Sequence, residues 1–105
     1  MSETALVRAL MLEAPILGVT LMRNNCGVLQ DVRGRYVRYG VGNPGGSDLI
    51  GWQHRTGRFV AVEAKVDGGR ATKAQKAFLE AVRTGGGIAG ICRSVDDLYA
   101  LLQPP

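Results

Sequence analysis

Residues 47–65, SDLIGWQHRTGRFVAVEAK, contain two segments rich in β-forming residues on either side of the turn-forming segment QHRTG. The segments SDLIGW and RFVAVEAK are typical of strands, and the Gly-containing connection predicts that they pair as an antiparallel hairpin. The preceding residues 43–46, NPGG, are a strong turn signal that marks where the first strand begins. We therefore expect this hairpin to belong to the central sheet of the protein.

Segments on both sides of the hairpin supply helices and further strands. Each predicted helix starts at a capping residue and carries apolar residues at helical spacing until a proline or glycine stops it. The helices are expected to follow Ser2, Thr72 and Ser94 (the last over residues 95–103) and to end near Pro15, Gly85 and Pro104. Further strands are expected at residues 18–23, 36–41 and 88–92. The order α-β-β-β-β-α-β-α predicts an α/β protein in which helices flank one central mixed β-sheet.

The composition is that of a globular domain. The chain has 105 residues, 46% of them hydrophobic and 21% charged, so residues 1–105 are expected to fold as a single domain around one core. The net charge is +4, and Arg, whose guanidinium group suits phosphate, is the commonest cation. This charge permits a polyanionic partner, and an ordinary solubilising surface is an equally good interpretation.

The cysteines and the N-terminus indicate a cytoplasmic protein. Cys26 and Cys92 are isolated in the sequence, which predicts reduced, partly buried thiols and neither a zinc site nor a disulfide framework. The N-terminal residues lack a basic region followed by a long apolar run, and no apolar run reaches membrane-spanning length. We therefore expect no membrane partner.

Three residues of the hairpin point to metal chemistry. Glu63 and Lys65 lie two apart on the second strand, so their side chains point to the same face. Alone, they predict an ion pair at a strand end. Asp48 changes this interpretation, because the hairpin can bring it beside Glu63, and neighbouring carboxylates need either a cation between them or a raised pKa. Since neither His nor Cys accompanies the acids, and Mg²⁺ prefers oxygen ligands, the pattern favours Mg²⁺.

These residues resemble those of a known family. The segments GSDLIGW, RFVAVEAK and TKAQKAFL are similar to the pattern of the PD-(D/E)xK nucleases, specifically the VRR-NUC group, and the resemblance covers nearly the whole chain. Ser47 stands where the superfamily name has Pro, but a Ser hydroxyl can form the same kind of turn. The resemblance implies a restriction-endonuclease-like core. The positions that match in order are Glu3, Arg23-Asn24-Asn25 with Gly27, Asp48, Glu63-Ala64-Lys65 and Gln75.

The resemblance implies a Mg²⁺-dependent endonuclease that hydrolyses phosphodiester bonds in DNA, with Mn²⁺ able to replace Mg²⁺. Asp48 and Glu63 would bind the metal together with the backbone carbonyl of Ala64, and Lys65 would position or deprotonate the attacking water. Glu3 is similar to a family glutamate that contacts the metal through water, and it is equally suited to complement the dipole of the first helix. The implied catalytic set is Asp48, Glu63, Lys65, Gln75 and Glu3.

Gln75 has two candidate roles. It is similar to the family's glutamine on the helix after the ExK motif, and it also completes a capping box in which its side chain reaches back to the amide of Thr72. We expect one side chain not to do both at once, and we favour the active-site role because Lys73 and Lys76 nearby suit a phosphate path.

Cationic residues on exposed segments are the candidate DNA contacts, since contacts to the phosphate backbone give affinity without sequence information. Tyr36 and Tyr39 offer rings that stack on bases at a branch point, but aromatic residues on strands are more often core residues. The cationic candidates are Arg23, Arg33, Arg35, Arg38, Arg70, Lys73 and Lys76.

The resemblance also implies a setting. Stand-alone VRR-NUC proteins are associated with bacteriophage and with cleavage of branched DNA such as four-way (Holliday) junctions, so we expect a phage- or prophage-encoded enzyme in the cytoplasm of a bacterial host cell. A body this small suits a homodimer whose two active sites make paired cuts. Two alternatives stay open: a non-catalytic DNA-binding module of the same fold, and a nuclease that cuts flaps or ordinary duplexes.

Overall fold

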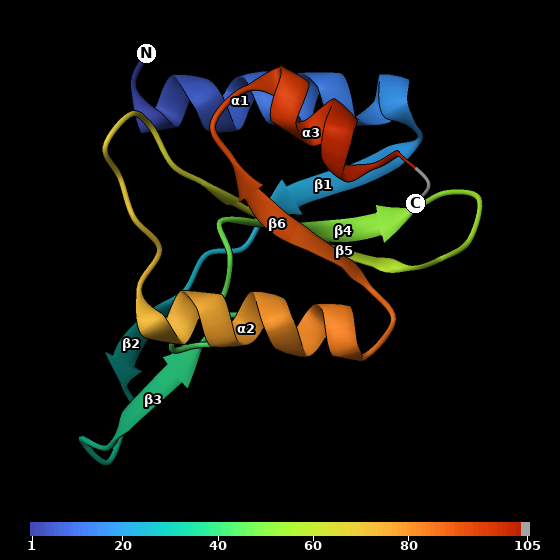
Figure 1. Cartoon of the computed structure of the whole chain (residues 1–105). Coiled ribbons are helices and arrows are strands. Elements are labelled where there is room, and N and C mark those ends of the chain that lie inside the picture. Colours follow the sequence, from blue (N-terminus) through green and yellow to red (C-terminus); the bar gives the residue numbers. More distant parts are fainter. Residues whose placement is uncertain (104–105) are drawn as a thin grey trace.

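The computed structural model describes residues 1–103, in which helices cover both faces of a four-stranded sheet (Figure 1). Strands β1 and β4 pair antiparallel, as do β4 and β5, whereas β6 runs parallel to β5. The sheet is therefore mixed, and β4 and β5 form the hairpin that the sequence predicted. In spatial order the strands are β1 (Val19–Arg23), β4 (Leu49–Gln53), β5 (Phe59–Ala64) and β6 (Ile88–Cys92).

The three helices begin at the predicted residues. Each N-cap side chain, from Ser2, Thr72 and Ser94, accepts a hydrogen bond from the backbone amide three residues later, which satisfies a free helix donor. Pro15 lies in a short 3-10 segment, η1 (Ala14–Leu17), that follows the first helix. The last helix is two residues shorter than predicted. The helices are α1 (Glu3–Glu13), α2 (Lys73–Thr84) and α3 (Val95–Leu101).

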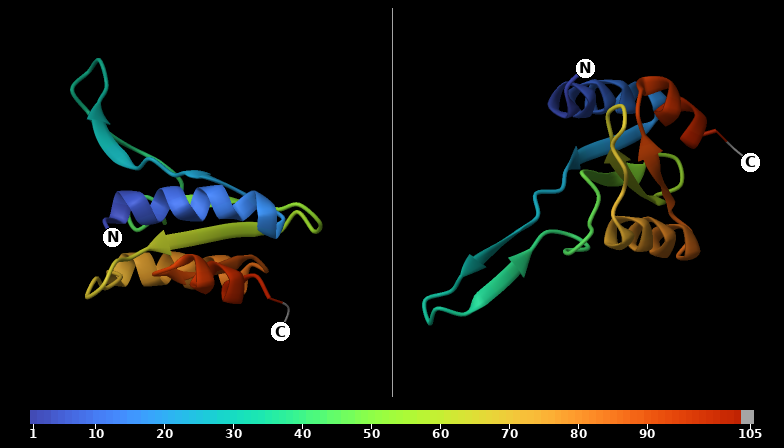
Figure 2. Two further views of the ribbon diagram at one scale, coloured as in Figure 1. Left: turned by 90° about the horizontal axis from the view of Figure 1, so that it is seen from above. Right: turned by 60° about the vertical axis from the view of Figure 1, so that its left-hand side comes forward.

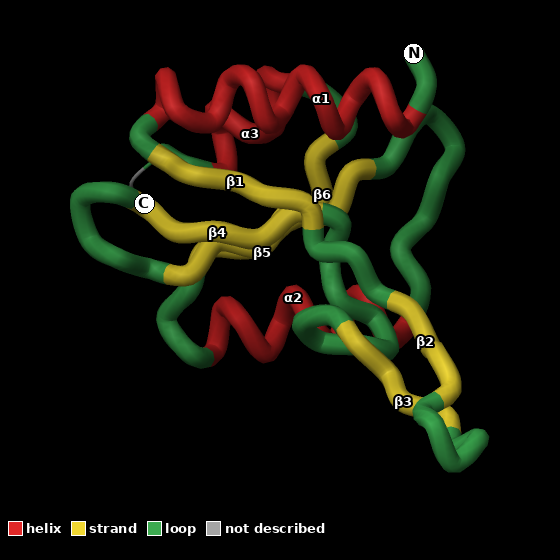
Figure 3. The backbone as a smooth tube through the Cα atoms, turned by 180° about the vertical axis from the view of Figure 1, so that it is seen from behind, coloured by secondary structure: helices red, strands yellow, loops and turns green. Residues whose placement is uncertain are grey.

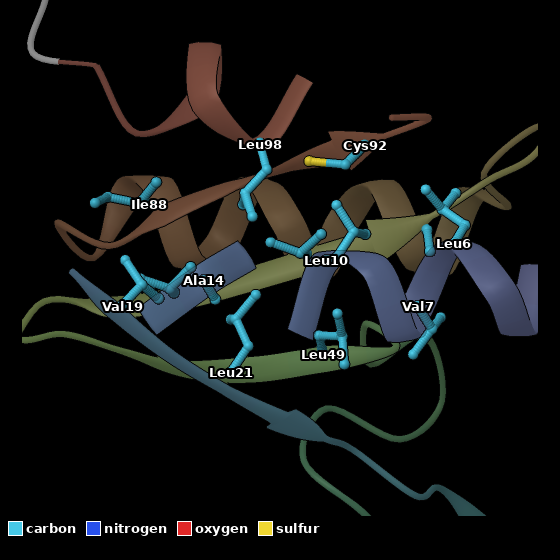
Figure 4. Close-up of a cluster of buried hydrophobic side chains, with 13 residues drawn as sticks. Leu6, Val7, Leu10, Ala14, Val19, Leu21, Leu49, Ile88, Cys92 and Leu98 are labelled. Carbon is cyan, nitrogen blue, oxygen red and sulfur yellow. The ribbon is translucent and has the colours of Figure 1, made fainter. Parts of the chain in front are cut away.

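The main core lies between the sheet and the pair α1 and α3 (Figure 4). Leu10 of α1, Leu98 of α3 and Leu49 of β4 are fully buried there. On the opposite face α2 covers β5 and β6, where Leu79 packs against Ala61 and Ala89. Because both faces of β5 are covered, this strand is buried along almost its whole length, including Glu63 near its end.

Two strands lie outside the central sheet. β2 (Gly27–Gln30) and β3 (Tyr36–Tyr39) pair antiparallel with each other only, and they form a ribbon that stands clear of the helices and the sheet (Figures 2 and 3). The sequence predicted β3 as part of one central sheet and did not predict β2. The physical reason is that β2, GVLQ, has two adjacent apolar residues without alternation and begins at Gly27, just after the turn-forming pair Asn24-Asn25.

The architecture of a central mixed sheet flanked by helices is confirmed, and it is compatible with a restriction-endonuclease-like core. Both cysteines are free thiols, but only Cys92 is buried, whereas Cys26 is exposed. Burial, aided by the charge of Asp97, raises the pKa of the Cys92 thiol to about 12, so this thiol is protonated and unreactive. Within residues 1–103 no helix combines the length and the apolar character needed to cross a membrane.

Candidate metal centre

The predicted metal ligands Glu3, Asp48 and Glu63 lie together at the edge of the central sheet that is formed by strand ends. β1, β5 and β6 end at this edge, and β4 begins there, because β4 runs antiparallel to both of its neighbours. Asp48 immediately precedes β4, and Glu63 is the second-last residue of β5. The first turns of α1, with Glu3, and of α2, with Gln75, face the same edge (Figure 1). The positive ends of two helix dipoles therefore lie beside the acidic residues.

Asp48 is held in place by two strands. The amide of Asn24, just after β1, donates to the Asp48 carbonyl oxygen at 2.8 Å, and the amide of Ala64 on β5 donates to Asp48 Oδ2 at 2.9 Å. The adjoining Ser47 is buried, and its hydroxyl donates to the carbonyl of Leu49 at 2.9 Å. These bonds fix the Asp48 carboxylate next to the end of β5.

Glu63 has two carboxylate oxygens in different surroundings. Oε1 accepts a hydrogen bond from Gln75 Nε2 at 3.3 Å and lies 3.7 Å from Lys65 Nζ, so the predicted contact between Glu63 and Lys65 is present. Oε2 is buried and has no hydrogen-bond partner among the described residues. A buried carboxylate oxygen without a partner costs free energy. A divalent cation is a partner that would satisfy it.

Three acids form one cluster. A carboxylate oxygen from each of Glu3, Asp48 and Glu63 lies within 4.8 Å of the others. Burial, and then the Asp48 carboxyl beside it, raise the pKa of Glu63 to about 8 against the opposing effect of Lys65. Without a cation, Glu63 therefore holds a proton at neutral pH. The cluster offers only oxygen ligands, which fit Mg²⁺ or Mn²⁺ better than zinc. The contribution of the Ala64 carbonyl stays a prediction.

Gln75 shows that one expectation was wrong. Its Oε1 accepts a hydrogen bond from the Thr72 amide at 2.8 Å, completing the capping box, while its Nε2 donates to Glu63. From the sequence these two roles were expected to exclude each other. A primary amide has an acceptor and a donor at opposite ends, so one side chain serves both.

The cationic candidates fall into two groups of exposed residues. The first lies near the metal centre and consists of Arg23 at the end of β1, Arg70 in the loop before α2, and Lys73 and Lys76 in the first turns of α2. The second lies on the β2–β3 ribbon and consists of Arg33, Arg35 and Arg38. Tyr36 and Tyr39 on the ribbon are 77% and 45% exposed, so their interpretation as core residues is wrong.

Asn24 is a site residue whose role the sequence analysis missed. Its Nδ2 donates to the carbonyls of Val41 and Ser47, at 2.8 and 3.0 Å, and its Oδ1 accepts from the Val41 amide at 3.0 Å. With its own amide bonded to Asp48, Asn24 clamps both ends of the loop that leads into the metal centre. The Asn24-Asn25 pair was visible in the sequence, but only its bonds across the fold give it a role.

Comparison with known proteins agrees with this geometry. A model of the VRR-NUC domain matches residues 23–96. The chain belongs to the VRR-NUC family. The matched region contains Asp48, Glu63, Lys65 and Gln75, whereas Glu3 lies before it. A search among curated proteins gave no match. Membership of the VRR-NUC family indicates a nuclease-type domain that processes DNA.

The clamp formed by Asn24 leads to a stability prediction. Asn24→Asp removes two hydrogen-bond donors and places a carboxylate against two carbonyl oxygens, so we expect the free energy of unfolding to fall by about 2 kcal/mol. Asn25→Asp is the matched control, because Asn25 is exposed and makes no side-chain hydrogen bond within residues 1–103; it should change stability by less than about 0.5 kcal/mol. Urea denaturation of both variants tests this, and equal effects would contradict the clamp.

The raised pKa of Glu63 predicts a dependence of metal binding on pH. Between its ordinary value of 4.5 and about 8, the folded metal-free protein holds a proton that the unfolded chain lacks, so stability falls as pH rises through this window. A cation competes with that proton. Mg²⁺ should therefore raise the Tm more at about pH 8.5 than at about pH 6.

Thermal melts with Mg²⁺ or a chelator at each pH measure this effect. Glu63→Gln, which cannot ionise, serves as the control and should flatten the pH dependence. An equal Mg²⁺-induced shift at both pH values in the wild type would be evidence against Glu63 as a ligand.

Proposed function

We propose that this VRR-NUC protein is a Mg²⁺-dependent, structure-specific DNA endonuclease that acts on branched DNA such as four-way junctions. The observation that carries the proposal is the buried Glu63 oxygen without a partner, in a cluster with Asp48 and Glu3 and beside Lys65. A structural ion pair would need only one acid and one base. Three acids around an unpaired oxygen suit a site that binds a divalent cation and, with it, a phosphate.

The side chains of the site would have two separate roles in hydrolysis. Asp48, Glu63 and Glu3 would hold Mg²⁺ or Mn²⁺, with the Ala64 carbonyl as a further ligand. When bound, the ion would stabilise negative charge on the phosphoryl oxygens and acidify water. Lys65, only 17% exposed, lies at the same site. As an ammonium group it would position the attacking water and offset charge on the phosphate, and as a neutral amine it would accept the proton of that water.

Other residues would orient the substrate and the site. Gln75 fixes Glu63 Oε1 by donating to it, so we assign Gln75 a positioning role as well as its cap. Arg23, Arg70, Lys73 and Lys76 are exposed around the same edge and would bind the phosphates on either side of the scissile bond. Such contacts do not read sequence, which suits an enzyme that recognises the shape of its DNA.

Replacement of the central residues should separate chemistry from binding. We expect Asp48→Asn and Lys65→Met to lower the rate of junction cleavage in Mg²⁺ by about 100-fold or more, since the first removes a metal ligand and the second removes positive charge beside the reacting phosphate. Binding of a labelled junction in Ca²⁺ should change little. Asp67→Ala, an exposed acid just after Lys65, is the control and should cut normally. Full activity in either Asp48→Asn or Lys65→Met would refute the catalytic assignment.

A cleavage panel of four-way junction, flap, splayed-arm and linear duplex tests the substrate class and the two alternatives. Preference for the junction supports the proposal, and preference for flaps or linear duplex replaces it with one of the alternatives. Binding without cutting in both Mg²⁺ and Mn²⁺ would identify a non-catalytic DNA-binding module.

We further propose that the protein acts as a homodimer, because a symmetric junction needs two cuts and one chain has one metal centre. Light scattering at micromolar concentration should therefore give twice the chain mass of 11.2 kDa. Cuts on opposite strands of one junction should appear together. A monomer mass combined with paired cutting would disprove this symmetry.

A further inference from the structure

The β2–β3 ribbon, called the arm below (residues 27–39), has no role in the metal centre. It projects from the same edge of the sheet and forms one end of a molecule that measures 47 × 31 × 24 Å (Figures 2 and 3). A two-stranded hairpin has little stability of its own in water. A chain that keeps such an element away from its core is expected to use it for contact with another molecule.

The strand register divides the arm into two faces. Residues directly opposite each other across the ladder point to the same side. Leu29 pairs with Val37, and Gly27 pairs with Tyr39, whose ring occupies the space where a side chain at Gly27 would lie, so this face is uncharged. The other face is polar and cationic, and it carries Val28, Gln30, Tyr36 and Arg38.

Charge favours a polyanion as the partner of the arm. The arm contains three Arg residues and one acid, Asp31. Asp31 accepts hydrogen bonds from the amides of Arg33 and Arg35 and forms an ion pair with the Arg35 guanidinium at 2.7 Å, so Arg35 shapes the turn. The guanidinium groups of Arg33 and Arg38 have no hydrogen-bond or ion-pair partner within residues 1–103, and both residues are exposed. They are free to bind phosphate.

Hydrogen bonds at the root hold the arm at a fixed place relative to the metal centre. The Nδ2 group of Asn43 donates to the carbonyls of Gly27 and Tyr39, each at 2.8 Å, and so ties the two strands to the loop that follows. Asn24 ties the same loop to the backbone of Asp48. These bonds give the arm a fixed position relative to Asp48.

We propose that the arm is a second DNA-contact surface, which grips the duplex that flanks the scissile phosphate. Arg33 and Arg38 bind backbone phosphates there, and the exposed ring of Tyr36 packs against sugar or base. A two-stranded ribbon matches the width of the B-DNA major groove, about 12 Å. This inference rests on the nuclease function proposed above, but it concerns binding far from the metal and assigns Arg35 to the shape of the turn and not to DNA.

The test uses the double variant Arg33→Gln/Arg38→Gln, the single variant Tyr36→Ala, and Arg55→Gln as matched control. Arg55 is an exposed arginine in the turn between β4 and β5, at the opposite end of the sheet (Figure 1). In Ca²⁺, we expect the double variant to bind a junction with a Kd about tenfold higher than that of the wild type. The slope of log Kd against log salt concentration should fall by the amount that corresponds to the loss of about two phosphate contacts. Tyr36→Ala should weaken binding less, and Arg55→Gln should bind and cut as the wild type does.

The length of the DNA provides the sharper readout. On junctions with duplex arms of about 20 base pairs the double variant should bind worse than the wild type, and on arms of about five base pairs, half a helical turn, the difference should disappear because the flank is missing. For cleavage in Mg²⁺, the KM of the double variant should exceed that of the wild type on the long duplex arms and equal it on the short ones.

Three results distinguish the outcomes. Binding and salt dependence equal to the wild type would overturn the role of the arm. If an arm variant has a lower particle mass than the wild type by light scattering but binds DNA equally well, the arm contacts a second copy of the chain and the DNA role is overturned. If the wild type binds through the arm but never cuts, the nuclease proposal fails while the arm proposal stands.

Discussion

Glu63 imposes the constraint on which the site depends, because it places a carboxylate in the interior of the protein at the end of the most buried strand. It is 2% exposed, and one of its oxygens has no partner among the described residues. A carboxyl group in such a place is tolerated only when it holds a proton or binds a cation. Lys65 offsets part of the cost at Oε1 but does not reach Oε2, and Asp48 and Glu3 add negative charge. The surrounding structure therefore favours a second cation that the chain itself does not provide.

The topology delivers this arrangement with few residues. Because β4 and β5 are antiparallel, the start of β4 lies beside the end of β5. Because β6 is parallel to β5, the chain crosses over through α2 and the end of β6 lies at the same edge. Both α1 and α2 begin at that edge, so their capped N-termini supply Glu3 and Gln75 from opposite faces of the sheet. The core holds these elements in register, so buried leucines and valines position the acidic side chains.

The sequence alone was enough to predict the helices, the hairpin and the convergence of Asp48 with Glu63. These features depend on local capping, on alternation along a strand and on a tight turn, all of which lie within a few residues of each other. The arm was not predicted, because β2 lacks apolar alternation and begins at Gly27, just after turn-forming residues. A local sequence pattern also does not show that β2 and β3 pair only with each other and not with the central sheet. The clamp made by Asn24 was missed for a related reason: its partners are 17 and 23 residues away in the chain.

The two hydrogen bonds of the Gln75 side chain show why Gln suits this position better than Glu, although either residue could cap the helix. A capping box accepts either Glu or Gln, because the helix needs only an acceptor for the Thr72 amide. Glu63 Oε1 accepts a hydrogen bond from the residue at this position, and only the amide has an Nε2 group that donates it. A Glu at this position would keep the cap but would bring another negative charge to a cluster that already holds three acids. The preference for Gln over Glu at this position therefore comes from the hydrogen bond to Glu63 and not from the cap of the helix.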